Sequence, residues 1–594
     1  MAAVDGCHSA GCERLSPEAL GPLPSFSQLG HCQRRLHLIS VRWCDGIGAM
    51  AAEITCDVVV VGSGAAGLSA ALAASVGGAQ VVVLEKARVL GGTTAMSAAG
   101  TWIPANHHML AAGISDSPEE ALAYLRATAP PGWEEEEDEL WEALARNSAP
   151  MLQFLEDRTP LVFELVNGPD PFSEAPGGKL KGRMVSPKLV SRYLLGRRWN
   201  GVRRSVKPQC FTYKEMGAIT KTPLHALARL APFLVWRLIS GQVGMGNGLI
   251  VGLVRGCLDA GCRIKTDASV SRLLTDGDTV AGVEAAIGGE VTHIHATKGV
   301  VLATGGFDWA PDYMSAYFPG IDIIGAPRTN TGDGQRMAAA VGAKLARMDQ
   351  ANIAPATFTV YEGKRHALPL HETYGPHCIL VNREGKRFVS EGSPNLGLAL
   401  DHRAPDGRSR NAPAWRIFDS RYSNRVSQAY AAKDPAFIRS ADTIEALAAK
   451  VGLDRTVLRA TVDRFNAWSK EGVDHDFHRG ESAWERHYSG TNSLAPIERG
   501  PFFAAPFLYA TVGTKGGPRT NDRCQVLRPD GRVIPGLYCA GLAMANPIGT
   551  KGVGAGTTIG PCLTFGYIAG KSTTQGNVAP MVSANDRELA AVRH

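Results

Sequence analysis

The sequence predicts an α/β fold organised around a parallel sheet, and three consecutive patterns support this prediction. Residues 56–61 (CDVVVV) form a continuous run that is typical of a strand buried on both faces of a parallel sheet. Residues 62–67 (GSGAAG) follow directly as a G-x-G-x-x-G turn, and the small residues over 68–75 predict a helix. Residues 80–84 predict a second strand, which ends at Glu85. Together these patterns predict a Rossmann-like dinucleotide-binding unit.

The residues of this unit have distinct physical roles in binding a dinucleotide. Gly62 permits the tight turn, Gly64 lets the backbone approach the pyrophosphate, and Gly67 lets helix and strand pack closely. The unpaired N–H groups at the start of the helix attract the phosphates. Glu85 follows Gly67 by 18 residues, which places it to bind a free ribose 2′-hydroxyl. This acid favours FAD or NAD over NADP.

Length and composition indicate a large globular protein. The chain has 594 residues, of which 44% are hydrophobic and 20% charged, and this excludes a mostly disordered protein. The 62 basic and 56 acidic residues nearly balance, so we expect no nucleic-acid partner. The twelve cysteines form neither a C-x-x-C pair nor a metal-binding spacing, so we expect a cytoplasmic protein with reduced thiols and no metal. No apolar run reaches the roughly 18 residues of a membrane span.

The two ends of the chain differ from the rest. Residues 1–49 show no helical or strand periodicity, so we expect either a disordered extension or a start assigned too far upstream. The compact protein is then expected to begin near Met50. Residues 577–594 are expected to form a tail.

Glycine-rich and hydroxyl-rich loops favour FAD over NAD. Residues 91–94 (GGTT) and 97–100 (SAAG) closely follow Glu85, which suits a longer cofactor with more phosphate and ring to bind. Near the end of the chain, residues 549–561 (GTKGVGAGTTIGP) precede a predicted helix over 558–570. The positive N-terminal end of that helix is expected to face the flavin pyrimidine and stabilise negative charge there.

The middle of the chain predicts further elements of the same domain. Strands are expected over 263–273 and 280–285. Residues 299–307 (GVVLATGGF) predict a strand that ends in paired glycines. Residues 331–334 (TGDG) predict the start of a helix over 335–341, whose N-terminus is another favourable place for an anion.

These segments together resemble the 3-ketosteroid Δ1-dehydrogenase branch of the fumarate reductase and succinate dehydrogenase flavoprotein superfamily. The segments are GSGAAGLSAAL, LEKARVLGGTTAMSAAGTWIPAN, PDPFSEAPGGKLKGR, VVLATGGF, TNTGDG, TKGGPRTNDRCQVL and GAGTTIGPCLTFGYIAG. The likeness runs from about Cys56 to Lys571. It implies a discontinuous, Rossmann-like FAD-binding domain over 50–324 and 501–576. An inserted α+β substrate (capping) domain over 325–500 is implied to close over the flavin.

The resemblance also implies which residues bind the cofactor. They are Gly62, Ser63, Gly64, Ala65, Ala66, Gly67, Glu85, Lys86, Gly91, Gly92, Thr93, Thr94, Ala99, Gly100, Val270, Ala303, Thr304, Gly305, Asp333, Gly541, Gly556, Thr558 and Ile559. Loop 91–100 lacks the histidine to which some relatives attach FAD. Noncovalent FAD is therefore expected.

The implied activity is an FAD-dependent oxidoreduction of a CH–CH bond next to a carbonyl, with hydride transfer to flavin N5. A ketosteroid-like or other small apolar cyclic ketone is the implied substrate, and the electron acceptor is left open. This chain has Gly552 where the family's keto-polarising tyrosine is expected, and residues 171–172 (PF) where another tyrosine is expected. Gly556 matches the family's backbone donor. Lys551 or Lys515 is therefore a candidate to polarise the carbonyl.

Three residues of the inserted domain are candidates for the acid–base group. Tyr361, His371 and Tyr374 precede or adjoin the predicted strand over 379–382, and Tyr374 is the favoured candidate. A histidine has a suitable ordinary pKa, whereas a tyrosine needs help to ionise.

Two alternative functions stay open at this point. A reductase of a small unsaturated acid, like fumarate reductase, is one of them. Residues 546–556 (NPIGTKGVGAG) contain neither the histidine nor the arginine with which that branch binds dicarboxylates, and this favours a less charged substrate. The other alternative is a flavin-binding protein that has lost its catalytic tyrosines.

Two further helices carry predictions of their own. Residues 223–241 predict an apolar helix that Pro232 kinks or splits. This helix is either a peripheral membrane contact, which would make the protein membrane-associated, or a lid or core helix. Residues 134–138 (EEEED) predict a solvated helix face.

Overall fold

The computed structural model describes residues 52–221, 223–370, 375–422, 437–490 and 493–575. The predicted extension over 1–49 and the tail over 577–594 lie outside the described residues. So do two of the candidate acid–base residues, His371 and Tyr374.

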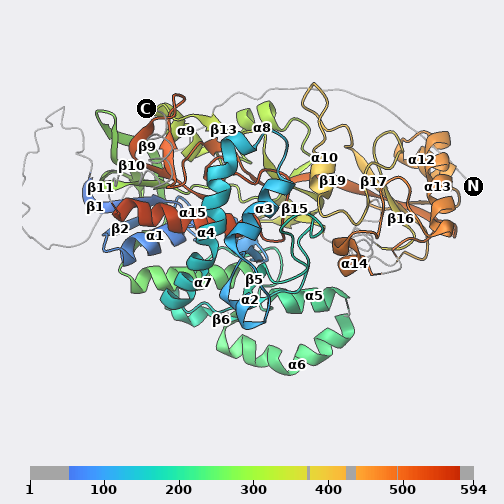
Figure 1. Ribbon diagram of the computed structural model, residues 1–594, viewed down its shortest axis with the longest axis horizontal. Helices are drawn as coiled ribbons and strands as arrows, with labels where there is room; N and C mark the ends of the chain where they lie inside the picture. Colours follow the sequence, from blue (N-terminus) through green and yellow to red (C-terminus); the bar gives the residue numbers. More distant parts are fainter. Residues whose placement is uncertain (1–51, 222, 371–374, 423–436, 491–492, 576–594) are drawn as a thin grey trace, which may run out of the picture. The chain divides into compact units, whose positions relative to one another are not determined.

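The first of two large sheets has eight strands and contains the predicted dinucleotide-binding unit (Figure 1). Strand β1 (Ala52–Val61) lies between β11 (Glu290–Leu302) and β2 (Val81–Leu84) and is parallel to both. The other strands are β8 (Arg263–Lys265) beside β2, β22 (Val533–Cys539) beside β11, β21 (Gln525–Leu527) beside β22, and the antiparallel hairpin of β9 (Ala268–Asp276) and β10 (Thr279–Ile287) on β11. The α/β fold with a Rossmann-like core is thus confirmed.

The single strand predicted over 263–273 is wrong in one respect. The structure has two strands there, because Asp267 adopts a left-handed backbone conformation with φ of 55° between β8 and β9. The first strand extends the parallel sheet beside β2, whereas the second pairs with β10.

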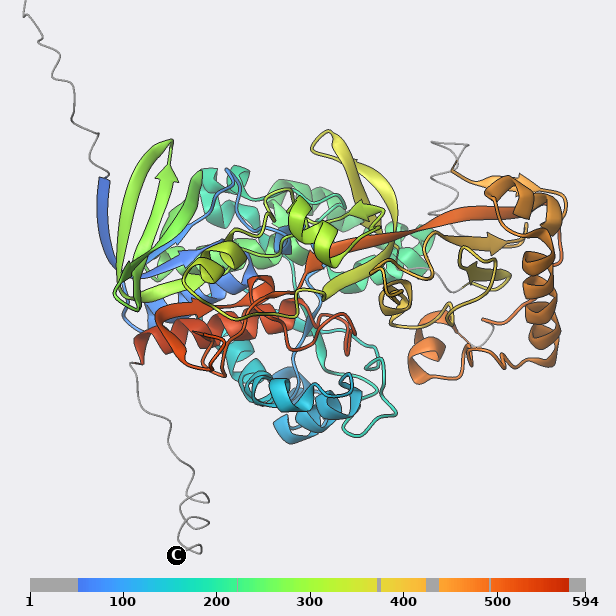
Figure 2. The same cartoon turned by 90° about the horizontal axis from the view of Figure 1, so that it is seen from above.

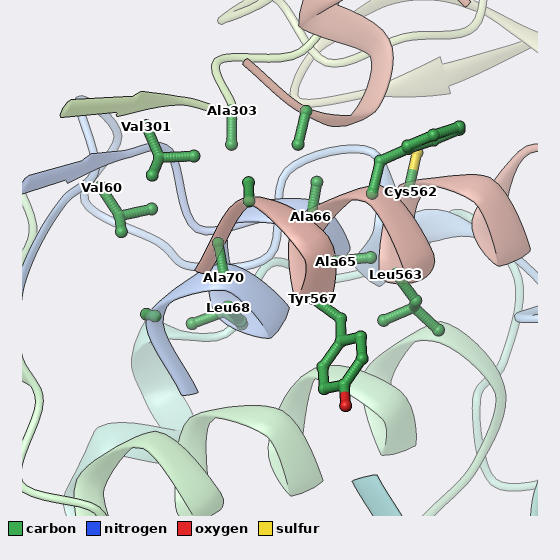
Figure 3. Packing of buried hydrophobic residues seen from close by; sticks show 14 of the residues in the cluster. Val60, Ala65, Ala66, Leu68, Ala70, Val301, Ala303, Cys562, Leu563 and Tyr567 are labelled. Atoms are coloured by element: carbon green, nitrogen blue, oxygen red, sulfur yellow. The ribbon is translucent and has the colours of Figure 1, made fainter. Parts of the chain in front are cut away.

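Helices α1 (Ala65–Val76) and α15 (Ile559–Thr574) pack on each other through small residues (Figure 3). A Cβ atom at Gly566 would lie 2.3 Å from the Ala66 carbonyl oxygen, and one at Gly570 would lie 2.2 Å from that of Ala70. Such distances admit no side chain, so the close packing of α15 on α1 depends on these glycines. The start of α15 is thereby fixed next to the glycine turn at the start of α1.

The second sheet has seven strands. They are β12 (Ile323–Ile324), β14 (Ala351–Tyr361), β15 (Lys364–Pro369), β16 (Cys378–Val381), β17 (Ala414–Phe418), β18 (Arg439–Ala441) and β19 (Phe502–Thr514). The long strand β19 pairs with β14 and β17 and can be followed in Figure 2. By hydrogen bonding, β12 and β19 belong with this sheet, and both lie within the predicted FAD-binding parts, outside residues 325–500. The boundaries themselves stay a prediction.

Helices α2 (His107–Ala111), α3 (Pro118–Thr128), α4 (Glu134–Arg158), α5 (Tyr213–Lys221), α6 (Pro223–Ser240) and α7 (Met245–Asp259) lie in the sequence between β2 and β8. Helix α6 runs through Pro232 without a break, so the predicted split does not occur. In the described part of the chain, no helix combines the length and apolar character needed to cross a bilayer.

The acidic run at the start of α4 is only partly solvated. Glu137 is fully buried, and its Oε1 accepts hydrogen bonds from Arg347 Nε at 2.8 Å and Arg519 Nη1 at 2.6 Å. The prediction of a solvated face is therefore wrong for Glu137, because two arginines pair with it inside the protein.

Candidate active site

A cavity of about 390 Å³ begins at the carboxyl end of β1 and is lined by residues of both large sheets. All the predicted cofactor-binding residues line it except Gly67 and Gly91. Those two glycines support the cavity from behind. A Cβ at Gly67 would lie 2.0 Å from the Gly62 carbonyl oxygen, and the Gly91 N–H donates to Ser63 Oγ at 3.0 Å.

The glycine turn after β1 is shaped for close approach of a ligand. Gly62 has φ of 110°, and a Cβ there would lie 2.3 Å from the Ala303 carbonyl oxygen. At Gly64, the nearest atom that a Cβ would meet among the described residues beyond its chain neighbours is Thr94 Oγ1, at 3.8 Å, because this position faces the cavity. The missing side chain at Gly64 thus leaves room for a ligand against the backbone at the N-terminus of α1.

Glu85 is held rigidly at the end of β2. Its Oε2 accepts hydrogen bonds from Ser63 Oγ at 2.6 Å and Ser63 N–H at 3.1 Å, while Oε1 accepts from Ala87 N–H at 2.9 Å. The carboxylate therefore has a fixed orientation at the cavity wall. This geometry suits the recognition of ribose hydroxyls.

Two further features of the cavity wall suit a bound cofactor. Lys86 Nζ donates to Asp333 Oδ2 at 2.6 Å and Thr331 Oγ1 at 2.5 Å, which fixes the start of helix α9 (Asp333–Ala340) at the wall. Thr304 also lines the cavity, and its buried Oγ1 has no hydrogen-bond partner among the described residues. An unpartnered buried hydroxyl is costly, and a bound ligand would satisfy it.

The loop before α15 faces the cavity at Gly556. This residue has φ of 95°, and a Cβ there would lie 2.5 Å from the Gly100 carbonyl group, so only glycine fits. Its carbonyl accepts from Trp102 and Gly560, while no described residue accepts a hydrogen bond from its N–H. Thr558 and Ile559 follow at the N-terminal end of α15, also at the cavity wall.

The two candidate lysines lie outside the cavity lining. Lys551 Nζ donates to the Thr128 carbonyl at 2.6 Å and lies 4.7 Å from the centre of the Phe172 ring. Lys515 is only 2% exposed and donates to the Gly549 carbonyl at 2.5 Å. Burial lowers the pKa of Lys515 to about 8. Both lysines thus hold neighbouring backbone, and neither is a group of the cavity wall.

The remaining candidate, Tyr361, is also absent from the cavity lining, and its hydroxyl donates to the Arg204 carbonyl at 2.7 Å. Sequence reasoning missed other residues of the cavity wall. They include Met184, Tyr213, Met245, Asn352, His366, Leu368, Pro369 and Val512. These residues come from separate helices and strands, so no local pattern could have identified them. Met184 and Tyr213 lie next to Gly100 of the predicted cofactor loop.

Two titratable side chains of this wall have shifted pKa values. Burial, together with the nearby Arg328, lowers the pKa of His366, so its imidazole is neutral at pH 7. Burial raises the pKa of Tyr213, which keeps its hydroxyl protonated. The wall therefore offers one potential base and one hydrogen-bond donor in apolar surroundings.

This arrangement of fold and cavity defines an FAD-dependent oxidoreductase. The chain belongs to the FAD binding domain family, which matches residues 57–559. The resemblance seen in the sequence is thereby confirmed, and so is FAD as the cofactor.

Characterised relatives are similar over most of the chain. A 4-oxocyclohexanecarboxylate 2-dehydrogenase of Sinomonas cyclohexanicum is 36% identical over 545 residues, which cover 87% of this chain and 92% of the relative. A 3-oxosteroid 1-dehydrogenase of Mycobacterium tuberculosis (strain ATCC 25618 / H37Rv) is 36% identical over 553 residues, covering 86% and 97%. The crystal structure of 3-ketosteroid delta1-dehydrogenase from Sterolibacterium denitrificans in complex with 1,4-androstadiene-3,17-dione matches with a TM-score of 0.80 at 31% identity, covering 88% and 99%.

Proposed function

We propose that this enzyme removes two hydrogens from the carbon–carbon bond next to the carbonyl of an apolar cyclic ketone. The observation that carries this proposal is the composition of the cavity wall. It combines apolar side chains with Tyr213 and His366, and the lining residues that the structure describes include no arginine. Its lysines are Lys207 and Lys86, and Lys86 is paired with Asp333. An apolar ketone fits such a wall, whereas a dicarboxylate needs cationic clamps.

In this proposal His366 takes the proton from the carbon next to the carbonyl. Its neutral imidazole can accept a proton at pH 7, and its 5% exposure keeps water away. Tyr213 donates a hydrogen bond from its protonated hydroxyl. The N–H of Gly556, which has no acceptor among the described residues, is a second donor, suited to a carbonyl oxygen that gains negative charge.

His371 and Tyr374 stay alternative candidates for the base because both lie outside the described residues. Lys551 keeps an indirect role, since it fixes the loop that contains Gly556 through its bond to the Thr128 carbonyl.

The cofactor-binding residues predicted from the sequence would hold FAD along the cavity from Glu85 to Ile559. When bound, FAD supplies the hydride acceptor. We infer that it is held noncovalently, since burial raises the pKa of the lining thiol Cys562 to about 12 and keeps it unreactive. Release of all flavin on acid precipitation would support this, and flavin retained in the protein pellet would contradict it.

The cellular setting is also part of the proposal. The eight described cysteines are free thiols, which supports a cytoplasmic location. Contact with a membrane through residues 223–241 would suit the substrate, because apolar ketones partition into lipid. The electron acceptor is left open, and the two-domain division with a substrate domain between the two FAD-binding parts stays a proposal.

The test compares three reactions of the FAD-loaded protein without oxygen. Androst-4-ene-3,17-dione and 4-oxocyclohexanecarboxylate are each mixed with oxidised protein, and fumarate is mixed with dye-reduced protein. Loss of the oxidised flavin absorbance with either ketone, together with formation of the unsaturated ketone, supports the proposal. Rapid reoxidation by fumarate without reaction of the ketones would instead favour the reductase of an unsaturated acid. Bound flavin that reacts in none of the three would favour a non-catalytic protein.

A further inference from the structure

Helix α6 exposes large apolar side chains to solvent. Phe233, Val235, Trp236, Leu238 and Ile239 are each between 56% and 72% exposed. Only Leu230, Leu234, Arg237 and Ser240 are partly covered in the part of α6 whose side chains are described, and they recur at helical spacing on the face toward the protein. Figure 1 shows α6 at the lower edge of the view. An exposed apolar surface of this kind marks an interaction site.

Two more apolar side chains continue this surface at the C-terminal end of α6. Tyr193 and Leu194 are 55% and 40% exposed and lie at the start of the 3₁₀ helix η2 (Arg192–Gly201). The Arg192 N–H donates to the Gly241 carbonyl, and the Tyr193 ring lies against Gly241. We call these two residues and the five exposed residues of α6 the α6 surface.

The stretch of sequence that contains the α6 surface is rich in basic residues. Residues 188–240 contain eleven lysines and arginines and one glutamate, so their formal charge of +10 exceeds the +6 of the whole chain. Arg197, Arg198, Arg204 and Arg229 are exposed. Glu215 pairs with Arg237 at 2.7 Å. Glu362 and Glu164, from other segments, pair with Arg203 at 3.1 Å and Lys214 at 3.4 Å, so the exposed arginines carry most of the remaining positive charge. This local excess of basic residues is not evident from the net charge of the whole chain.

The α6 surface is joined to the wall of the active-site cavity. Arg237 Nη1 donates to the Cys210 carbonyl at 3.1 Å and to Glu215 Oε2 at 2.9 Å. The segment 205–213, which these bonds hold, contributes Ser205, Val206, Lys207, Gln209 and Tyr213 to the cavity. After α6 the chain returns to the same cavity at Met245. Both connections of the α5–α6 unit thus reach the cavity wall.

We propose that the α6 surface docks on an anionic lipid bilayer and that apolar substrate passes from the bilayer to the cavity along segment 205–213. A helix with exposed tryptophan, phenylalanine and leucine beside arginines is suited to lie in the lipid interface. The surrounding positive charge favours anionic headgroups over zwitterionic ones. The passage of substrate rests on the proposed function, whereas the docking does not.

The test is sedimentation of the FAD-loaded full chain with lipid vesicles in the absence of substrate. Vesicles of phosphatidylcholine alone are compared with vesicles containing phosphatidylglycerol, at low and high salt. We expect roughly tenfold stronger binding to the anionic vesicles, and weaker binding at 1 M salt because the Debye length falls from about 10 to about 3 Å. Equal binding to both vesicle types, or no binding, would overturn the proposal.

Two matched triple variants locate the contact. Trp236→Ser, Leu238→Ser and Ile239→Ser together are expected to lower vesicle binding at least about tenfold. Leu110→Ser, Leu180→Ser and Val360→Ser remove equally exposed apolar side chains elsewhere and are expected to leave vesicle binding unchanged.

A pair of charge variants tests the basic residues. Arg197→Glu with Arg198→Glu should weaken binding to anionic vesicles, with Lys386→Glu and Lys470→Glu as the charge control.

Other possible results of these experiments also decide whether the α6 surface docks on lipid. Flavin content and melting temperature identify any variant that has not folded, and the salt dependence of the unmodified protein then carries the test. A dimer that the α6 triple variant converts to a monomer, with no vesicle binding by either, would assign the surface to a second copy and overturn lipid docking. Failure of ketone oxidation with intact vesicle binding would reject the proposed function and leave the docking standing.

Discussion

The side chain of Asn395 hydrogen-bonds both polar groups of the Gly552 backbone. Its Oδ1 accepts from the Gly552 N–H at 2.8 Å, and its Nδ2 donates to the Gly552 carbonyl at 3.2 Å. Asn395 precedes helix α10 (Leu396–Leu400), which packs on β14 of the second sheet. Gly552 lies in the loop that leads to Gly556 and α15. The loop expected to face the flavin is therefore fastened to the second sheet.

Substitution of Asn395 should therefore impair turnover without loss of flavin. Asn395→Ala removes both hydrogen bonds and frees the loop that positions the Gly556 N–H. We expect kcat/KM for the ketone to fall about tenfold or more, because small displacements of a positioned donor are costly. Flavin content should stay normal. The exposed Asn200→Ala is the control, and an Asn395→Ala variant with unchanged kcat/KM would show that this loop needs no such attachment.

Thr304 offers a way to separate cofactor binding from protein stability. Thr304→Val removes a buried hydroxyl that has no partner among the described residues, so the flavin-free protein should be as stable as before or more stable. The affinity for FAD should fall about tenfold, in keeping with the loss of one buried hydrogen bond. Titration of flavin-free protein with FAD and thermal unfolding measure the two quantities.

Thr357→Val is the matched control, because Thr357 has an equally unpartnered buried hydroxyl but does not line the cavity. It should change stability in the same direction and leave FAD affinity unaltered. If Thr304→Val bound FAD as well as the unmodified protein, the hydroxyl would not contact the cofactor.

Buried Lys515 should make stability depend on pH. Its pKa is about 8 in the folded protein and 10.5 ordinarily, so the unfolded chain binds more protons between these values and stability rises with pH there. The rise from this group is on the order of 3 kcal/mol. The free energy of unfolding of the unmodified protein minus that of Lys515→Met should thus increase from pH 8 to pH 10.5. A difference that stays constant over this range would show that Lys515 is not buried as a charged group.

His366 should determine the fall in kcat at low pH. Its lowered pKa means that the base form persists at pH 7 and is lost only at a pH below the range in which an ordinary histidine titrates. His366→Gln should cut kcat by about a hundredfold and abolish this limb of the pH profile.

Tyr374→Phe provides the competing comparison for the same role. A hundredfold loss of kcat in Tyr374→Phe, with His366→Gln retaining the limb, would transfer the role of base to Tyr374. Both variants are checked for normal flavin content, so that a loss of kcat reflects the proton transfer.

The sequence predicted the cofactor-binding residues that line the cavity, but not Tyr213 and His366. Gly62, Gly64 and Glu85 belong to a contiguous strand–turn–helix–strand pattern whose spacing follows directly from the requirements of phosphate and ribose binding. Tyr213 and His366 come from segments about 150 residues apart, and only the pairing of strands and helices brings them to one cavity.

Burial was the other property that local patterns did not predict. Lys515 and Glu137 lie in hydrophilic segments, yet tertiary contacts bury both side chains. The same reason explains why β19 is part of the second sheet, since strand pairing depends on partners distant in the sequence.

The most direct test of the proposed function is anaerobic mixing of the FAD-loaded protein with a cyclic ketone while the flavin absorbance is followed. We expect loss of the oxidised flavin band and a stoichiometric amount of the ketone with a new carbon–carbon double bond next to its carbonyl. An oxidised band that persists with both the steroid and the cyclohexanone substrate, in protein that holds a full complement of FAD, would contradict the proposed function.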